Sequence, residues 1–180
     1  KYKDSDEPKE FSEYMKAVAK TVKEKASQHN FPMPFVFIEP GRAIVGAECV
    51  TLYTVGSVKT IPNIRTYVSV DGGMGDNPRY ILYQSDYEVI CANKAALKRT
   101  KSVTVAGRCC ESGDLIQENT LVQHVKAGDI LAVLSTGAYN YSMASNYNRY
   151  PRPAVIAVSE GNSKIIIKRE TYENIIENDI

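Results

Sequence analysis

The hydrophobic and polar positions form two different patterns along the chain. Over residues 10–29, apolar residues recur at helical spacing and Lys and Glu fill the opposite face, which predicts an amphipathic helix ended by Pro32 and Pro34. Residues 35–40, FVFIEP, are a short apolar run that ends in a charged residue, as a fully buried parallel strand does. Together they make one αβ unit, which cannot be a domain because its strand has nothing to pair with.

From about residue 50 the chain consists of short segments rich in Val, Ile, Thr and Tyr, most of them bounded by Gly, Asn, Asp or Pro. We expect strands within residues 51–61, 65–73, 79–92, 101–110, 130–136 and 154–170. A hairpin turn is expected at 159–164, and a helical pattern returns only at 171–180. The fold class is therefore mainly β, an antiparallel sandwich or barrel of six to eight strands.

The change of pattern places a domain boundary near residues 43–52, with 42–48 as a short linking helix. We assign residues 1–45 to the last αβ units of a larger α/β domain and residues 46–180 to a C-terminal β domain. Because the earlier units of that α/β domain are not in the sequence, we expect residues 1–45 either to pack poorly or to associate with a second molecule.

Composition narrows the class of protein. Hydrophobic residues make up 43% and charged residues 24%, as in ordinary globular proteins, and the net charge of +1 indicates neither nucleic acid nor an acidic membrane as a partner. No apolar stretch approaches the ~20 residues that span a bilayer, and the polar first ten residues do not resemble a signal peptide. Four cysteines without a CxxC pair indicate neither a disulfide framework nor a zinc site. We expect a cytoplasmic protein without a metal.

Two clusters of polar residues lie in the first half of the chain. Glu39-Pro40-Gly41-Arg42 ends the expected strand, where α/β barrels build their active sites, and Arg suits a carboxylate or phosphate; a surface turn is the structural alternative. Residues 70–74, VDGGM, are a turn signal, and Arg79 and Tyr83 after them share a face on either a helix or a strand.

Two further clusters lie in the second half. Residues 109–114 read CCESGD, and we expect Cys109 to be a small buried hydrophobe, whereas Cys110 could serve as an acid near cationic groups. Residues 137–153, from Gly-Ala-Tyr139 to Pro-Arg-Pro, are typical of a ligand-lining loop. Asn146 and Asn148 within it have a structural alternative, which is to satisfy turn backbone.

In this order, the segments EPGRAIVGAE, VDGGM…R…LY, CESGD and GAY…SMASNYN resemble the diaminopimelate decarboxylase family over most of residues 39–155. The resemblance implies a homodimer of (β/α)₈ barrels that bind pyridoxal phosphate, each followed by a β-rich C-terminal domain. It implies decarboxylation of meso-diaminopimelate to L-lysine and CO₂, the last step of lysine biosynthesis.

The resemblance also implies a role for each matched residue. Glu39, Pro40, Gly41 and Arg42 would line the cofactor phosphate, with Arg42 also reaching a substrate carboxylate. Arg79 and Tyr83 would bind substrate, and Tyr139 would contact both cofactor and substrate. Cys110, donated across the dimer interface, would protonate the α-carbon, and Glu111 beside it would recognise the distal ammonium group.

One departure from the family is that the lysine that carries the cofactor as a Schiff base is not matched in this chain. We therefore expect the 180 residues to be a fragment that is inactive alone. Two alternatives remain: a decarboxylase of the same fold for ornithine, arginine or a carboxylated polyamine, which Glu111 disfavours, and a non-catalytic interaction module.

Overall fold

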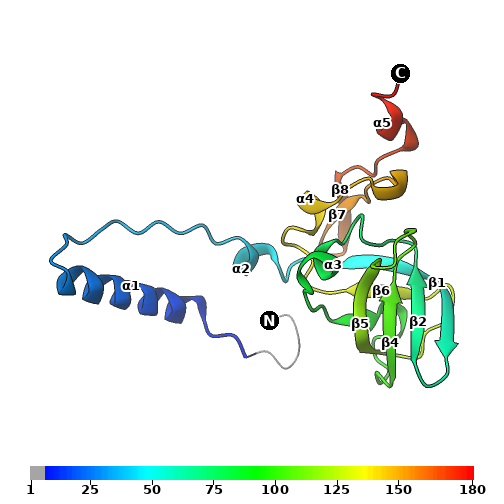
Figure 1. The fold of residues 1–180 in the computed structure, drawn as a ribbon, viewed down its shortest axis with the longest axis horizontal. Helices are drawn as coiled ribbons and strands as arrows, with labels where there is room; N and C mark the ends of the chain where they lie inside the picture. Colours follow the sequence, from blue (N-terminus) through cyan, green and yellow to red (C-terminus); the bar gives the residue numbers. More distant parts are fainter. Residues whose placement is uncertain (1–6) are drawn as a thin grey trace.

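The computed structural model describes residues 7–180, and its largest feature is a six-stranded sheet curled into a nearly closed barrel (Figure 1). The strand order is β3-β6-β1-β2-β4-β5, and β7 and β8 form a separate two-stranded sheet. The strands are β1 Thr51–Ile61, β2 Arg65–Val70, β3 Val89–Cys91, β4 Lys101–Ala106, β5 Leu115–Val122, β6 Ile130–Val133, β7 Val155–Ser159 and β8 Asn162–Ile167. The helices are α1 Phe11–Gln28, α2 Arg42–Val45, α3 Arg79–Tyr83, α4 Asn140–Met143 and α5 Tyr172–Ile176, with 3₁₀ turns at Ala92–Lys94 and Tyr147–Arg149.

The barrel interior is filled mainly by β-branched residues that alternate along the strands. On β2, Val68 and Val70 are almost fully buried, and such alternation turns one face of a strand toward the core. On β4, Thr104 is buried together with Val103 and Val105 on either side of it. The mainly β class predicted from the sequence is confirmed, and so is the hairpin turn between β7 and β8, which pair in antiparallel fashion.

Two buried glutamines close the barrel where its edge strands β3 and β5 meet. Gln117 on β5 accepts a hydrogen bond from the Tyr87 backbone N–H at 2.9 Å, and Gln123 just after β5 accepts one from the Cys91 N–H at 2.8 Å. Gln123 also donates to backbone carbonyls of the segment that follows β3. Side-chain amides thus take the place of a backbone ladder along this seam.

Three expectations about the β region were wrong in detail. The sheet is not wholly antiparallel, because β2 and β4 pair in parallel. Residues 79–83, expected within a strand, form helix α3, since the preceding turn is closed by an Asn77 N–H bond to the Gly73 carbonyl and leads into Pro78. The pattern missed β5, whose polar Gln117 and Glu118 hide the alternation.

Residues 7–45 contribute no buried side chain to the barrel core. Helix α1 begins and ends close to where the pattern predicted, but none of its residues is buried. Figure 1 shows α1 and the segment after it reaching away from the barrel. The buried strand predicted at 35–40 is wrong for this chain: no strand forms there, and Phe35 and Phe37 are 93% and 90% exposed. A strand needs a neighbour for its backbone groups, and the described residues supply none at this place. The poor packing expected of this region is confirmed for its described part.

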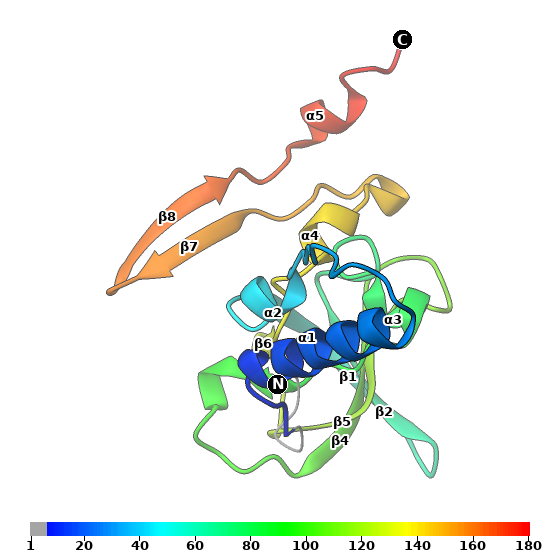
Figure 2. The same ribbon diagram turned by 90° about the vertical axis from the view of Figure 1, so that its left-hand side faces the viewer.

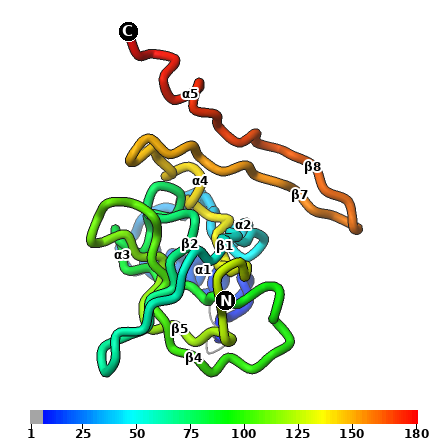
Figure 3. The backbone as a smooth tube through the Cα atoms, turned by 90° about the vertical axis from the view of Figure 1, so that its right-hand side faces the viewer, coloured from blue at the N-terminus to red at the C-terminus, as the bar shows by residue number. Residues whose placement is uncertain are grey.

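The C-terminal segment also leaves the barrel, as Figures 2 and 3 show for β7, β8 and α5. The hairpin is exposed along both strands apart from its ends. Glu170 anchors its exit: the carboxylate accepts bonds from the Arg152 backbone and guanidinium and from Asn146. Helix α5 starts with a capping box between Thr171 and Asn174. No helix in residues 7–180 is long and apolar enough to cross a membrane.

Candidate functional site

Four predicted site residues come together where α2, α3 and the loop before α4 meet. The Tyr139 ring is in contact with two guanidinium groups: the Arg42 Cζ is 5.0 Å from the ring centroid and the Arg79 Cζ is 5.6 Å from it. Arg79 also lies 5.0 Å from the centroid of the Tyr83 ring, one helical turn further along α3. Two guanidinium groups in contact with one tyrosine ring make a positively charged site that suits an anion such as a carboxylate or a phosphate.

The loop before α4 is held against α2 by close backbone contacts. The Gly137 N–H bonds to the Gly46 carbonyl at 3.1 Å, and a Cβ at Gly137 would lie only 1.8 Å from the Val45 carbonyl oxygen. Gly41 in turn lies under Tyr139, because a Cβ there would be 2.7 Å from the tyrosine hydroxyl. The glycines of the EPGR and GAY segments therefore allow the two segments to touch, and this contact places Arg42 against Tyr139.

Two features mark the backbone and side chains of this cluster as unusual. Tyr139 has φ 72°, in the left-handed region that few non-glycine residues adopt. The Arg79 Nε is buried and has no hydrogen-bond partner among the described residues, while its Nη1 lies 3.7 Å from the Met143 sulfur. An unpaired guanidinium N–H is costly to bury. With the Tyr139 ring shared with a second arginine, the Arg79 guanidinium belongs to a cluster whose charge suits a phosphate or carboxylate group.

The CCESGD loop is built around a buried carboxylate. Asp114, 4% exposed, accepts bonds from the backbone N–H groups of Met74, at 2.6 Å, and Cys109, at 2.5 Å. It thereby ties this loop to the DGGMGD loop. The second carboxylate of that loop, Asp76, accepts from the Tyr53 hydroxyl and from the Gly73 N–H, and burial raises the pKa of Asp76.

Cys109 and Cys110 differ in exposure, although Cys109 is less buried than the sequence predicted. Cys109 is partly buried, and burial together with the neighbouring Asp114 raises the pKa of its thiol to about 11, so it stays protonated at neutral pH. Cys110 is exposed, and its backbone N–H donates to the Asn148 side chain at 3.1 Å. Glu111 is also exposed, and the Tyr147 hydroxyl donates to it at 3.4 Å. Cys110 and Glu111 are thus presented at the surface by residues of the 137–153 loop.

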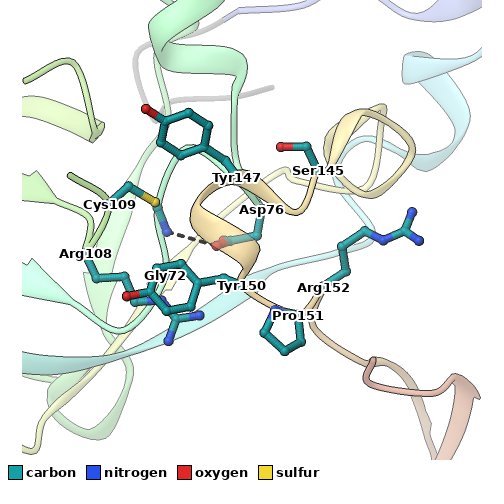
Figure 4. Close-up of a pocket in the computed structure, with 11 residues that line it drawn as sticks. Gly72, Asp76, Arg108, Cys109, Ser145, Tyr147, Tyr150, Pro151 and Arg152 are labelled. Atoms are coloured by element: carbon teal, nitrogen blue, oxygen red, sulfur yellow. Dashed lines mark hydrogen bonds between the residues drawn. The ribbon is translucent and has the colours of Figure 1, made fainter. Parts of the chain in front are cut away.

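Figure 4 shows the junction between these two loops. The Arg108 guanidinium stacks on the Tyr150 ring, with its Cζ 3.8 Å from the centroid. Between Gly72, Cys109 and Tyr147 a void of only about 10 Å³ remains, enough for one water molecule. The junction is packed rather than hollow, so it positions Cys110 and Glu111 and is too small to hold a substrate.

The structure thus divides the predicted residues into two groups. Arg42, Arg79, Tyr83 and Tyr139 form one cluster. Cys110 and Glu111 are held by other residues, and the two groups are linked through α3, where Ile81 packs against Gly113 of the CCESGD loop. Glu39 and Pro40 lie in the exposed segment before α2.

Sequence reasoning did not single out Asp76, Asn77, Asp114 or Asn140 as supports of the site, although all four lie in or beside its motifs. Their signal was only their place next to glycine-rich turns, which a surface turn would also explain. Asn146 does satisfy turn backbone, since it donates to the Tyr150 carbonyl at 3.0 Å. Asn148 instead accepts from Cys110.

The barrel, the arginine–tyrosine cluster and the CCESGD loop define a known class. The chain belongs to the pyridoxal-dependent decarboxylases: the family described as "Pyridoxal-dependent decarboxylase, C-terminal sheet domain" matches residues 15–137. The recognition made from the motifs is therefore confirmed, and the family supports pyridoxal phosphate as cofactor.

Individual relatives indicate which pyridoxal-dependent decarboxylases this chain is similar to. Diaminopimelate decarboxylase of Bacillus subtilis (strain 168) is 51% identical over 180 residues, which are 100% of this chain and 41% of the relative. The enzyme of the same name from Synechocystis is 48% identical, over 99% of this chain and 38% of the relative. The crystal structure of diaminopimelate decarboxylase from M. jannaschii in co-complex with L-lysine superimposes with a TM-score of 0.85 at 30% identity, covering 99% of this chain and 40% of that one. This chain spans about two fifths of the length of these relatives.

Proposed function

We propose that these residues are the C-terminal part of a pyridoxal-phosphate-dependent diaminopimelate decarboxylase, which converts meso-diaminopimelate to L-lysine and CO₂. The observation that carries the proposal is the contact of the Tyr139 ring with the guanidinium groups of both Arg42 and Arg79. Identity of about half to decarboxylases of that name supports the choice of substrate. Residues 1–45 would be the end of the cofactor-binding barrel and residues 46–180 the β domain.

The residues that the motifs bring to the site suit the cofactor and both ends of the substrate. Glu39, Pro40, the backbone of Gly41, the Arg42 guanidinium and the Tyr139 hydroxyl would line the cofactor phosphate. When bound, pyridoxal phosphate supplies an electron sink for the carbanion left as CO₂ departs. The tasks left to this chain are to orient the substrate and to deliver a proton.

Diaminopimelate is an amino acid at both ends, so its distal end needs a cation for the carboxylate and an anion for the ammonium group. Arg42 and Arg79 would bind the carboxylate, with Tyr83 beside them, and Glu111 would bind the ammonium group. The Cys110 thiol would donate its proton to the α-carbon.

We propose that the intact enzyme is a homodimer. Cys110 and Glu111 are exposed at the surface and are held apart from the arginine–tyrosine cluster, which supports their donation into the site of a second subunit. The 180 residues alone would then be inactive, since the lysine that carries the cofactor belongs to the barrel. A reducing cytoplasm suits a protein that keeps four free thiols.

The test is CO₂ release by the full-length protein with pyridoxal phosphate, offered meso-diaminopimelate, ornithine or arginine. We expect release from diaminopimelate alone. Cys110→Ala should lower kcat by about 10²–10⁴-fold, as loss of a general acid does. Glu111→Ala should raise KM by about tenfold or more because the ammonium group loses its partner.

Matched controls separate these effects from general damage. Cys49→Ala removes another exposed thiol and Glu177→Ala another exposed carboxylate, and both should retain activity. Turnover of ornithine or arginine instead of diaminopimelate would keep the class and overturn the role given to Glu111. Cofactor binding without release from any of the three would refute the proposed activity.

A further inference from the structure

Beneath the exposed cluster lies a buried hydrogen bond between two asparagine side chains. The Asn140 Nδ2 donates to the Asn77 Oδ1 at 2.7 Å, and the Tyr87 hydroxyl donates to the Asn140 Oδ1 at 3.3 Å. All three residues are buried, with exposures of 0% for Asn77, 3% for Asn140 and 2% for Tyr87. Asparagine is rarely enclosed to this degree, and the Asn77 Nδ2 has no hydrogen-bond partner among the described residues. Loss of the bond to the Asn77 Oδ1 would leave further polar atoms buried without a partner.

The bond is important because each asparagine lies close in the sequence to a residue of the site. Asn77 precedes Arg79 by two residues, in the turn that starts α3, and Asn140 directly follows Tyr139. The bond therefore joins two backbone segments 63 residues apart at the points where they present Arg79 and Tyr139. Those two side chains meet above it, with the Arg79 Cζ 5.6 Å from the Tyr139 ring centroid.

The backbone of Tyr139 needs such an anchor. Its φ of 72° is unfavourable for a residue with a side chain and persists only where the surroundings enforce it. The Asn140 amide, fixed on one side by Asn77 and on the other by Tyr87, holds the peptide that follows Tyr139. The Tyr139 side chain itself is half-exposed, and the Tyr139 carbonyl accepts bonds from the Met143 N–H at 2.9 Å and from the Ser142 hydroxyl at 3.1 Å. The first turn of α4 and the Asn140 amide therefore together hold this peptide.

We propose that Asn77 and Asn140 are positioning residues that set the spacing between Arg79 and Tyr139, and thereby the affinity for the distal carboxylate of the substrate. This inference rests on the proposed function. Neither asparagine touches the ligand, because both lie below the surface that the arginines line. They act by holding the Arg79 guanidinium at a fixed distance from the Tyr139 ring, and so at the place where Arg79 binds the carboxylate.

The product L-lysine and its decarboxylated analogue cadaverine offer a specific readout. L-Lysine keeps the distal carboxylate and ammonium group of diaminopimelate and lacks only the carboxylate that leaves as CO₂. Cadaverine, 1,5-diaminopentane, carries both amino groups and no carboxylate. A defect confined to the carboxylate clamp must therefore weaken binding of lysine and leave binding of cadaverine unchanged.

The experiment uses the full-length, cofactor-loaded enzyme and compares wild type with Asn77→Ala, Asn140→Ala and the double variant. A misplacement of about 1 Å costs up to about 100-fold, so we expect KM for meso-diaminopimelate and Ki for L-lysine to rise about tenfold in each single variant. kcat and Ki for cadaverine should stay within about twofold. The double variant should be no worse than either single one, because the two residues form one unit.

Two controls keep the result interpretable. Val68→Ala removes a fully buried side chain of β2 and lowers stability without touching the asparagine pair, so KM should not change. If an alanine variant fails to fold, Tyr87→Phe removes only the flanking 3.3 Å bond and should raise Ki for lysine about twofold to threefold, again without a change for cadaverine.

Each outcome bears on one claim. If wild type releases no CO₂ from diaminopimelate, the proposed function fails, and this inference fails with it. If wild type is active but the asparagine variants keep KM and lysine Ki within twofold, the positioning role alone is refuted. An equal rise in Ki for lysine and cadaverine would also refute it, since that indicates a general loosening of the site.

Discussion

Replacing Gln123 with leucine should destabilise the barrel at the seam between β3 and β5. Gln123 is 2% exposed, and its Oε1 is the acceptor for the Cys91 backbone N–H at 2.8 Å. Cys91 is itself fully buried, so its N–H has no access to water when that acceptor is lost. Leucine has nearly the same volume as glutamine, which keeps the packing and isolates the hydrogen bonds.

The magnitude follows from the bonds removed. A buried N–H without an acceptor costs about 1–3 kcal/mol. The two bonds from the Gln123 Nε2, at 3.5 Å to the Ala95 carbonyl and 3.4 Å to the Leu97 carbonyl, are long and add little. We expect a loss of about 2 kcal/mol in the free energy of unfolding, or a decrease of about 4–8 °C in Tm for a chain of this size.

The assay is urea unfolding of the 180-residue chain, with amide hydrogen exchange at Cys91 as the local measurement. Gln28→Leu, at the exposed end of α1, is the matched control and should change the free energy of unfolding by less than about 0.5 kcal/mol. A Gln123→Leu variant as stable as wild type, with Cys91 equally protected, would refute the view that side-chain amides hold this seam.

Two further predictions concern the supports of the site. Hydrogen bonds from Arg152 lower the pKa of Glu170 to about 2, so the stabilisation is complete above pH 5 and is lost as the pH falls toward 2. Glu170→Gln should therefore cost about 1 kcal/mol at pH 7, a value reduced because Arg152 is more than one third exposed, and the difference from wild type in acid titrations should shrink to nothing near pH 2. Gly137→Ala would place a Cβ 1.8 Å from the Val45 carbonyl oxygen and should displace α2, lowering Tm and substrate affinity together. Gly56→Ala, whose Cβ would lie 3.7 Å from its nearest neighbour, should be tolerated by the same two measurements.

Helix α1 and the segment after it show that a local sequence pattern is sufficient for a helix and not for a strand. The helix forms because its spacing and composition are sufficient locally, whereas the FVFIEP run stays extended and exposed. A strand depends on neighbours for its hydrogen bonds, so a strand pattern without neighbours does not form a strand. The same limit explains α3: a run such as RYILY fits either structure, and the turn before it decided in favour of the helix.

The sequence by itself determined the class of fold, the starts of strands β1, β2, β4 and β6, and the family. Alternation of β-branched residues and the turn signals between them are local properties, and they located β1, β2, β4 and β6 and the β7–β8 hairpin. The motifs singled out Arg42, Arg79, Tyr139, Cys110 and Glu111 because charged and polar residues beside glycine-rich turns are not explained by a strand pattern.

Only the tertiary structure determined which residues distant in the sequence form hydrogen bonds with each other. The bond between Asn77 and Asn140 and the closure of the barrel by Gln117 and Gln123 join residues about 30 to 63 positions apart. In the sequence each is a lone polar residue that could equally face water. Whether a polar side chain is buried, and which partner then satisfies it, depends on how the loops and edge strands meet, and no local pattern records that.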